Sequence, residues 1–169
     1  MQRRRLLTLG FGAAVALAVT VGGFSRLRPE SSVGHLSPKA LAIFTAFARA
    51  VLDGSLPELA SARDDQLQAH LRRVGEAISS FPPATQTELS QLLSLLATAP
   101  GRRLLTGLTT TWDEATVEEL QACLQRMRTS SLSLRQQTYH ALRDLTNAAF
   151  YADPQAWPLM GYPGPVSVG

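Results

Sequence analysis

Residues 61–81, SARDDQLQAHLRRVGEAISSF, carry the clearest structural pattern in this chain. Their apolar side chains recur at steps of three and four, which predicts one buried stripe on an amphipathic helix. Ser61, with Asp64 three residues later, resembles a capping box at the start of this helix, and Pro82-Pro83 is expected to end it. The stripe consists of Leu67, Leu71, Val74, Ile78 and Phe81.

The flanking segments show the same period. Helices are expected over 37–52, 85–98, 116–128 and 133–151. Ser37-Pro38 and the pair Thr116 and Glu119 mark two of their starts, whereas the run 99–101 (Ala-Pro-Gly) is expected to stop a helix. Residues 102–108 have room for one or two further turns. Strand signals are almost absent. The chain is therefore predicted to be all-α, a single bundle of about five helices.

Composition limits the kind of partner that the chain can bind. The net charge of +3 comes entirely from Arg3, Arg4 and Arg5, because the other basic residues equal the acidic ones in number. A neutral body has no clustered basic face, and nucleic acid is therefore not expected as a partner. The single cysteine, Cys123, cannot form a disulfide within the chain.

The first 28 residues have the layout of an export signal. An arginine cluster is followed by the uncharged stretch Leu6–Ser25 and then by two further arginines. Arg3 and Arg4, followed after one residue by Leu6 and Leu7, fit the twin-arginine pattern. The uncharged stretch is rich in glycine and alanine, so it is only mildly apolar. A twin-arginine signal is favoured over ordinary secretion.

Two fates of this leader remain open. A small-x-small site at residues 16–18 predicts cleavage after Ala18. Alternatively, twenty uncharged residues are long enough to span a bilayer core of about 30 Å, and the leader then stays as an anchor in the inner membrane. Either way, the expected location is the periplasm or the periplasmic face of the inner membrane.

Catalytic patterns are missing from the rest of the chain. His35, His70 and His140 lie in different segments without a second ligand at helical spacing, so no metal site is expected. Cys123 adjoins an apolar stripe, which predicts a buried structural thiol or, failing that, a disulfide with a partner chain. No nucleophile elbow, phosphate loop or haem-attachment motif occurs. The chain is therefore not expected to be an enzyme.

Three acidic pairs lie near the expected helix starts, where carboxylates complement the helix dipole. Neighbouring carboxylates point to different sides of a helix, so these pairs are not expected to form an acid/base dyad. They are Asp64-Asp65, Asp113-Glu114 and Glu118-Glu119.

The C-terminal stretch from residue 151 differs from everything before it. Four prolines and two glycines within residues 151–165 are expected to exclude helix and strand. Three aromatic residues lie in the same stretch, and Trp and Tyr are frequent anchors of interfaces. The tail is therefore expected to pack either on its own bundle or on a partner protein. The predicted organisation is a signal or membrane anchor at residues 1–28, a helical bundle at residues 29–150 and an irregular docking tail at residues 151–169.

This tail resembles the C-terminal signature of the gluconate 2-dehydrogenase subunit 3 family. The matching residues, which the resemblance implies to be partner-binding, are Tyr151, Asp153, Pro154, Trp157, Gly161, Tyr162, Pro163, Gly164 and Pro165. Residues further upstream agree with it, namely Trp112, Ala115, Ser130, Arg135 and Tyr139. A twin-arginine leader is also typical of that family.

The resemblance implies a division of labour between subunits. The large subunit of such complexes is a glucose-methanol-choline-type flavoprotein that holds FAD and oxidises a sugar or an alcohol. The small subunit binds no cofactor, stabilises the large one and escorts it through the twin-arginine translocase, and a cytochrome c subunit often accepts the electrons. The alternative is a free-standing, membrane-anchored periplasmic helical interaction protein without a flavin partner.

Overall fold

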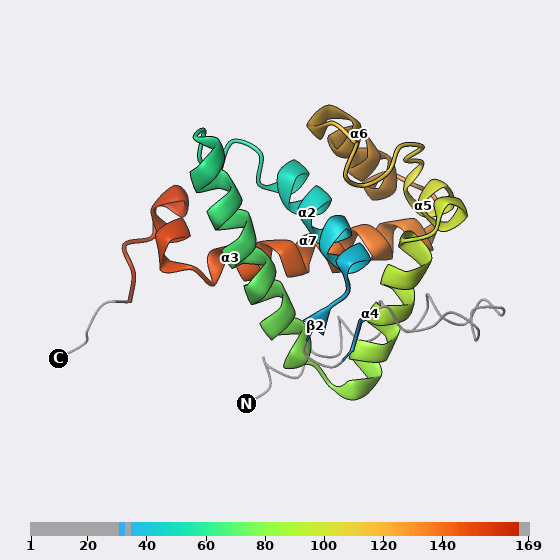
Figure 1. Cartoon of the computed structure of the whole chain (residues 1–169), viewed down its shortest axis with the longest axis horizontal. Coiled ribbons are helices and arrows are strands. Elements are labelled where there is room, and N and C mark those ends of the chain that lie inside the picture. Colours follow the sequence, from blue (N-terminus) through green and yellow to red (C-terminus); the bar gives the residue numbers. More distant parts are fainter. Residues whose placement is uncertain (1–30, 33–34, 166–169) are drawn as a thin grey trace.

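The computed structural model describes residues 31–32 and 35–165 (Figure 1). The leader, with Arg3, Arg4, Leu6 and Leu7, lies outside the described residues. Within these residues, two short antiparallel strands precede six α-helices and a 3-10 helix, and the all-α prediction is confirmed. The elements are β1 (Ser31–Ser32), β2 (His35–Leu36), α2 (Pro38–Val51), α3 (Ala60–Ser79), α4 (Pro83–Leu96), α5 (Ala99–Thr106), α6 (Val117–Arg128), α7 (Ser133–Tyr151) and η1 (Pro154–Met160).

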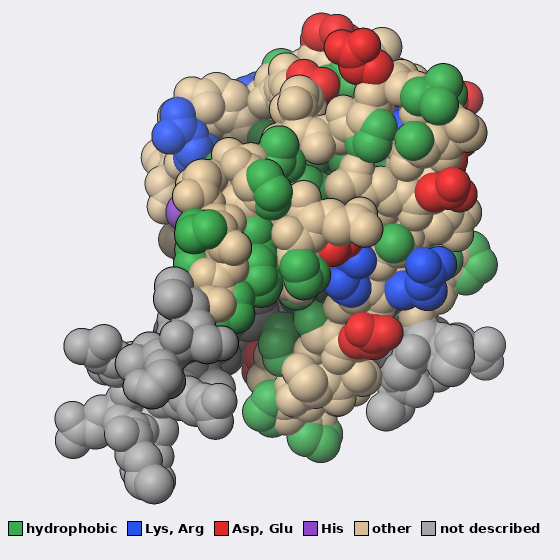
Figure 2. All heavy atoms as spheres, turned by 90° about the vertical axis from the view of Figure 1, so that its left-hand side faces the viewer, with side chains coloured by type: hydrophobic (Ala, Val, Ile, Leu, Met, Phe, Trp, Pro, Cys, Tyr) green, Lys and Arg blue, Asp and Glu red, His purple; other side chains and the backbone are tan. Residues whose placement is uncertain are grey.

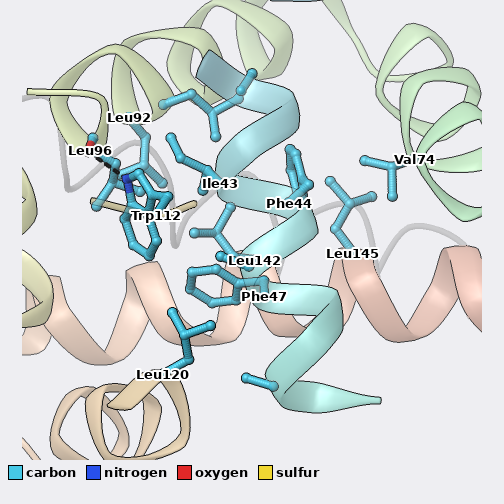
Figure 3. Close-up of a cluster of buried hydrophobic side chains, with 14 of the residues drawn as sticks. Ile43, Phe44, Phe47, Val74, Leu92, Leu96, Trp112, Leu120, Leu142 and Leu145 are labelled. Atoms are coloured by element: carbon cyan, nitrogen blue, oxygen red, sulfur yellow. Dashed lines mark hydrogen bonds between the residues drawn. The ribbon is translucent and has the colours of Figure 1, made fainter. Parts of the chain in front are cut away.

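Helix α2 forms the centre of the core, because it packs against α3, α4, α6 and α7. Its apolar side chains cover most of its circumference, so such a helix is stable only when neighbours surround it. Ile43, Phe44 and Phe47 are almost fully buried and meet Val74 of α3 and Leu142 of α7 in the main hydrophobic cluster (Figure 3).

Two helix starts form as the sequence predicts. The Oγ of Ser37 accepts a hydrogen bond from the backbone N–H of Ala40 at 3.2 Å, and Pro38 takes the first helical position. At α6, the N–H of Thr116 donates to Oε2 of Glu119 at 3.0 Å, while the N–H of Glu119 donates back to Oγ1 of Thr116 at 3.2 Å. This is the expected capping box.

Other boundaries differ from the expectation. Helix α3 begins one residue before Ser61, after Leu59, whose side chain cannot cap it. Asp64 and Asp65 consequently lie beyond its first turn. Pro83 opens α4, because proline lacks only an N–H that the first turn leaves unpaired. The run 99–101 likewise opens α5, with Thr98 as its cap, and the described residues thus contain six α-helices rather than about five.

Trp112 joins the long connection between α5 and α6 to the core. Its indole N–H donates to the carbonyl oxygen of Leu96 at 3.0 Å, and its ring centroid lies 6.0 Å from that of Phe47 (Figure 3). One side chain therefore holds together the end of α4, the centre of α2 and a segment without regular structure.

A helix that crosses a membrane must be long and apolar enough to span the bilayer core. Over residues 31–32 and 35–165, the helices are too short or too polar to cross a membrane.

Candidate docking surface at the C-terminal segment

The C-terminal segment forms a short 3-10 helix, η1, so the expectation of a wholly irregular tail is wrong for residues 154–160. Asp153 caps this helix, since its Oδ1 accepts from the N–H of Gln155 at 3.0 Å, and Pro154 occupies the first turn. Gly161 ends it in the left-handed conformation with φ of 69°. A 3-10 helix needs only local i to i+3 bonds, so it accommodates proline where a longer α-helix does not.

An ion pair attaches η1 to the bundle. Arg73 of α3 contacts Oδ2 of Asp153 through Nη1 at 3.1 Å, while its Nε donates to the carbonyl oxygen of Ala149 at 2.9 Å. Both charged side chains are about one fifth exposed, so water screens this pair less than an ion pair at the open surface. Arg73 thus connects α3, the end of α7 and the start of η1.

Apolar packing supports the same attachment. Ala156 of η1 is buried together with Phe150 of α7 in a second hydrophobic cluster, separate from the main one. The buried members of this second cluster are Ala48, Leu52, Leu67, Phe150 and Ala156. One side of η1 therefore packs on its own bundle.

Trp157 organises the residues that follow. Its indole N–H donates to the carbonyl oxygen of Tyr151 at 3.0 Å, and its ring centroid lies 5.3 Å from that of Tyr162. Gly164 is buried against the same ring with φ of 101°, and a Cβ there would lie 3.4 Å from the indole. Glycine is favoured at this position by its left-handed conformation, whereas a Cβ would make only an ordinary contact with the ring.

Three large apolar side chains of the segment are open to solvent. Leu159, Met160 and Tyr162 are 59%, 51% and 45% exposed, and we call these three side chains the tail patch. Hydrophobic side chains gather in several places among polar ones on the face that carries α3 and η1 (Figure 2). Clustered exposed apolar side chains on a fixed element are typical of an interaction surface.

Two hollows adjoin the tail patch. A groove of about 740 Å³ runs between the α2–α3 loop, the first half of α3 and η1, and Leu159 forms part of its wall. A smaller hollow of about 260 Å³ is lined by Pro154, Trp157, Pro158, Gly161, Tyr162 and Pro163. Both are open, so they suit a protein surface better than an enclosed small molecule.

The structure divides the nine residues predicted to bind a partner. Asp153 attaches the segment to α3, and Gly164 packs against the ring of Trp157 within the segment. Tyr151 is half-buried at the end of α7. The exposed residues are Pro154, Gly161, Tyr162, Pro163 and Pro165.

Sequence reasoning missed Leu159 and Met160, whose apolar character in a proline-rich stretch was the available signal. It also missed Arg73, which lies far from Asp153 along the chain and had no local signal.

Cys123 and the acidic pairs are the remaining candidate residues from the sequence. Cys123 is buried, as predicted, and burial raises the pKa of its thiol. It lies 1% exposed beside Met127, so in this conformation it cannot reach a partner's cysteine. Glu118 and Glu119 lie in the first turn of α6, as predicted, whereas Asp113 and Glu114 precede that helix.

The acidic and metal-ligating residues also remain apart. Within residues 31–32 and 35–165, no three His, Cys, Asp or Glu side chains come together as metal ligands. Comparison of the chain with protein-family models, with curated proteins and with solved structures finds no match.

Proposed function

We propose that this chain is the non-catalytic small subunit of a flavin-dependent dehydrogenase of the glucose-methanol-choline type, which it binds, stabilises and escorts to the periplasm. FAD and the sugar or alcohol substrate belong to the large subunit, and a cytochrome c subunit is a further candidate partner. The proposal rests on the twin-arginine pattern, on the resemblance of the tail, and on the two-sided build of that tail.

The observation that carries the proposal is the tail patch on an anchored segment. Arg73, Ala156 and Trp157 hold η1 in place, while Leu159, Met160 and Tyr162 stay open to solvent. An apolar surface that is already ordered loses little conformational entropy when a partner covers it. Tyrosine is also among the residues that contribute most to binding energy at interfaces.

Charges placed in the tail patch are expected to weaken the complex. In the double variant Leu159→Glu and Tyr162→Asp, two carboxylates would have to lose water on docking, which opposes association. We expect the Kd for the flavoprotein to rise roughly 30-fold or more, as for loss of one interface hot spot. Co-purification with the flavoprotein partner tests whether the complex forms, and calorimetric titration measures its Kd.

The matched control is Leu104→Glu in α5. Leu104 is 61% exposed, a fraction similar to the 59% of Leu159. Helix α5, however, lies on the opposite side of the molecule from η1 (Figure 1). This control should bind the flavoprotein normally. Equal weakening by both variants would remove the tail patch as the docking surface, and a colourless monomer from the native strain would favour the free-standing alternative.

Export of the complex provides a separate test of the escort role. Replacing Arg3 and Arg4 by lysine keeps the charge but removes the twin-arginine pair. Both subunits should then stay in the cytoplasm, as measured by cell fractionation and periplasmic dehydrogenase activity. If the flavoprotein still reached the periplasm, the escort role would be wrong even if the complex formed.

A further inference from the structure

His70 of α3 is fully buried beside Phe150, near the end of α7. Its ring meets that of Phe150 edge-on, with centroids 6.5 Å apart. Neither Nδ1 nor Nε2 has a hydrogen-bond partner within the described part of the chain. A buried imidazole without an acceptor is tolerated as the neutral form but not as a cation.

The charged groups around His70 give a proton no support. On α3 itself, Arg73 faces the ring with a positive charge. From the α7–η1 turn comes Asp153, whose carboxylate is paired with that same Arg73, and the carbonyl of Ala149 accepts from Arg73 as well. Helix α2 contributes the apolar side chains of Ala48 and Leu52 to the Phe150 cluster.

These surroundings set the protonation of His70. Burial, and secondarily the charge of Arg73, lower its pKa from 6.5 to about 4. In the folded chain the ring is therefore neutral at pH 7. Because the unfolded form takes up the proton first, the stability contributed by the neutral ring is complete above pH 6.5 and is lost as the pH falls toward 4.

We propose that His70 is a proton-sensitive latch, whose protonation releases η1 and the end of α7 from α3 while the main core stays folded. The release is local because Phe150 and Ala156 belong to the second cluster, whereas the buried apolar side chains of α4 and α6 belong to the main one. Local opening of a terminal element lets the charged ring reach water without unfolding the domain. This proposal does not depend on the proposed function.

The two tryptophans report on the two regions separately. The indole N–H of Trp157 is bonded to Tyr151 beside the second cluster, and that of Trp112 to Leu96 in the main one. In ¹⁵N spectra of the full-length chain, the indole N–H signal of Trp157 should shift as the pH falls from about 6.5 to 4, because the segment that carries it leaves α3. The indole signal of Trp112 should stay unchanged. Simultaneous loss of both signals would mean global unfolding and would overturn the proposal.

The variant His70→Phe should move the midpoint of the Trp157 transition at least about one pH unit lower, since the proton acceptor is gone. The control His140→Phe removes an exposed histidine and should leave the midpoint unchanged. An unchanged midpoint in His70→Phe would assign the transition to another group and would overturn the proposal.

Two further measurements keep the test decisive. If His70→Phe lacks the Trp112 signal at neutral pH, His70→Leu serves as the smaller apolar replacement. The ring protons of His70 in the unaltered chain report its titration directly. A midpoint at or above the ordinary value of about 6.5 would overturn the proposal whatever the variants show.

Discussion

Trp112→Ala is expected to lower the free energy of unfolding by about 3–5 kcal/mol, the range observed for loss of a buried large aromatic side chain. The indole is 5% exposed and contacts Phe47 at the centre of the core. Its removal leaves a cavity between α2, α4 and the α5–α6 connection. The loss is large beside a typical total stability of about 5–15 kcal/mol. Urea denaturation of the two proteins measures the difference.

The variant Trp112→Phe separates packing from hydrogen bonding. Phenylalanine retains most of the ring but lacks the N–H that donates to Leu96 at 3.0 Å. We expect it to be destabilised by about 1–2 kcal/mol, the usual effect of losing one buried hydrogen bond. Equal losses in the two variants would show that the hydrogen bond, not the packed ring, is the main contribution.

Gly101→Ala is the second substitution with a large expected effect. A Cβ at this position would overlap the backbone carbonyl of Leu95, and it would also lie 2.7 Å from the Cδ1 atom of the same leucine. Because a backbone carbonyl cannot rotate away like a side chain, α5 would have to shift relative to α4. We expect a loss of about 2–3 kcal/mol or more, at the upper end of overpacking effects.

Gly75→Ala provides the matched control for Gly101→Ala. Gly75 lies inside α3, where a Cβ would meet nothing within 4 Å. Alanine favours helix over glycine by up to about 1 kcal/mol, so this variant should be as stable as the original chain or more stable. Thermal unfolding followed by circular dichroism compares the two. A Gly101→Ala protein that melts with the original chain would show that the α4–α5 turn yields freely.

The start of α5 shows how far local sequence signals predict structure. Thr98 followed by Ala-Pro-Gly carries both a helix cap and a helix breaker, and only the cap acts here, with Oγ1 accepting from the N–H of Gly101 at 3.1 Å. Proline is compatible with a first turn, and glycine is required by the approach of Leu95. The sequence displays both residues, but the distance between two neighbouring helices determines which role they play.

The candidate docking surface was predictable in place but not in detail. Aromatic residues among prolines and glycines indicated that residues 151–165 pack on something. Which side chains face the bundle depends on Arg73, whose partner Asp153 is distant in sequence. Tyr162, expected to bind a partner, packs against the ring of Trp157 and is still 45% exposed. It therefore contributes both to packing within the segment and to the tail patch.

His70 illustrates the same limit for chemistry. In sequence it is an ordinary residue on a helix, and the helical pattern gives no sign that it is buried without hydrogen-bond partners. That property arises because α7 and the second cluster close over α3 and supply no acceptor. Protonation behaviour depends on surroundings brought together by folding.

The sequence by itself determined the all-α class, the start of α2 at Ser37-Pro38, the capping box of α6 and the buried state of Cys123. These follow from short-range periodicity and from hydrogen bonds between residues three or four apart. Tertiary structure alone decided which side chains of the tail pack on the bundle and which stay open, that Gly101 must lack a side chain, and that His70 is without an acceptor. Each of these depends on groups that are distant in the chain or on the spacing of packed helices, which local patterns do not encode.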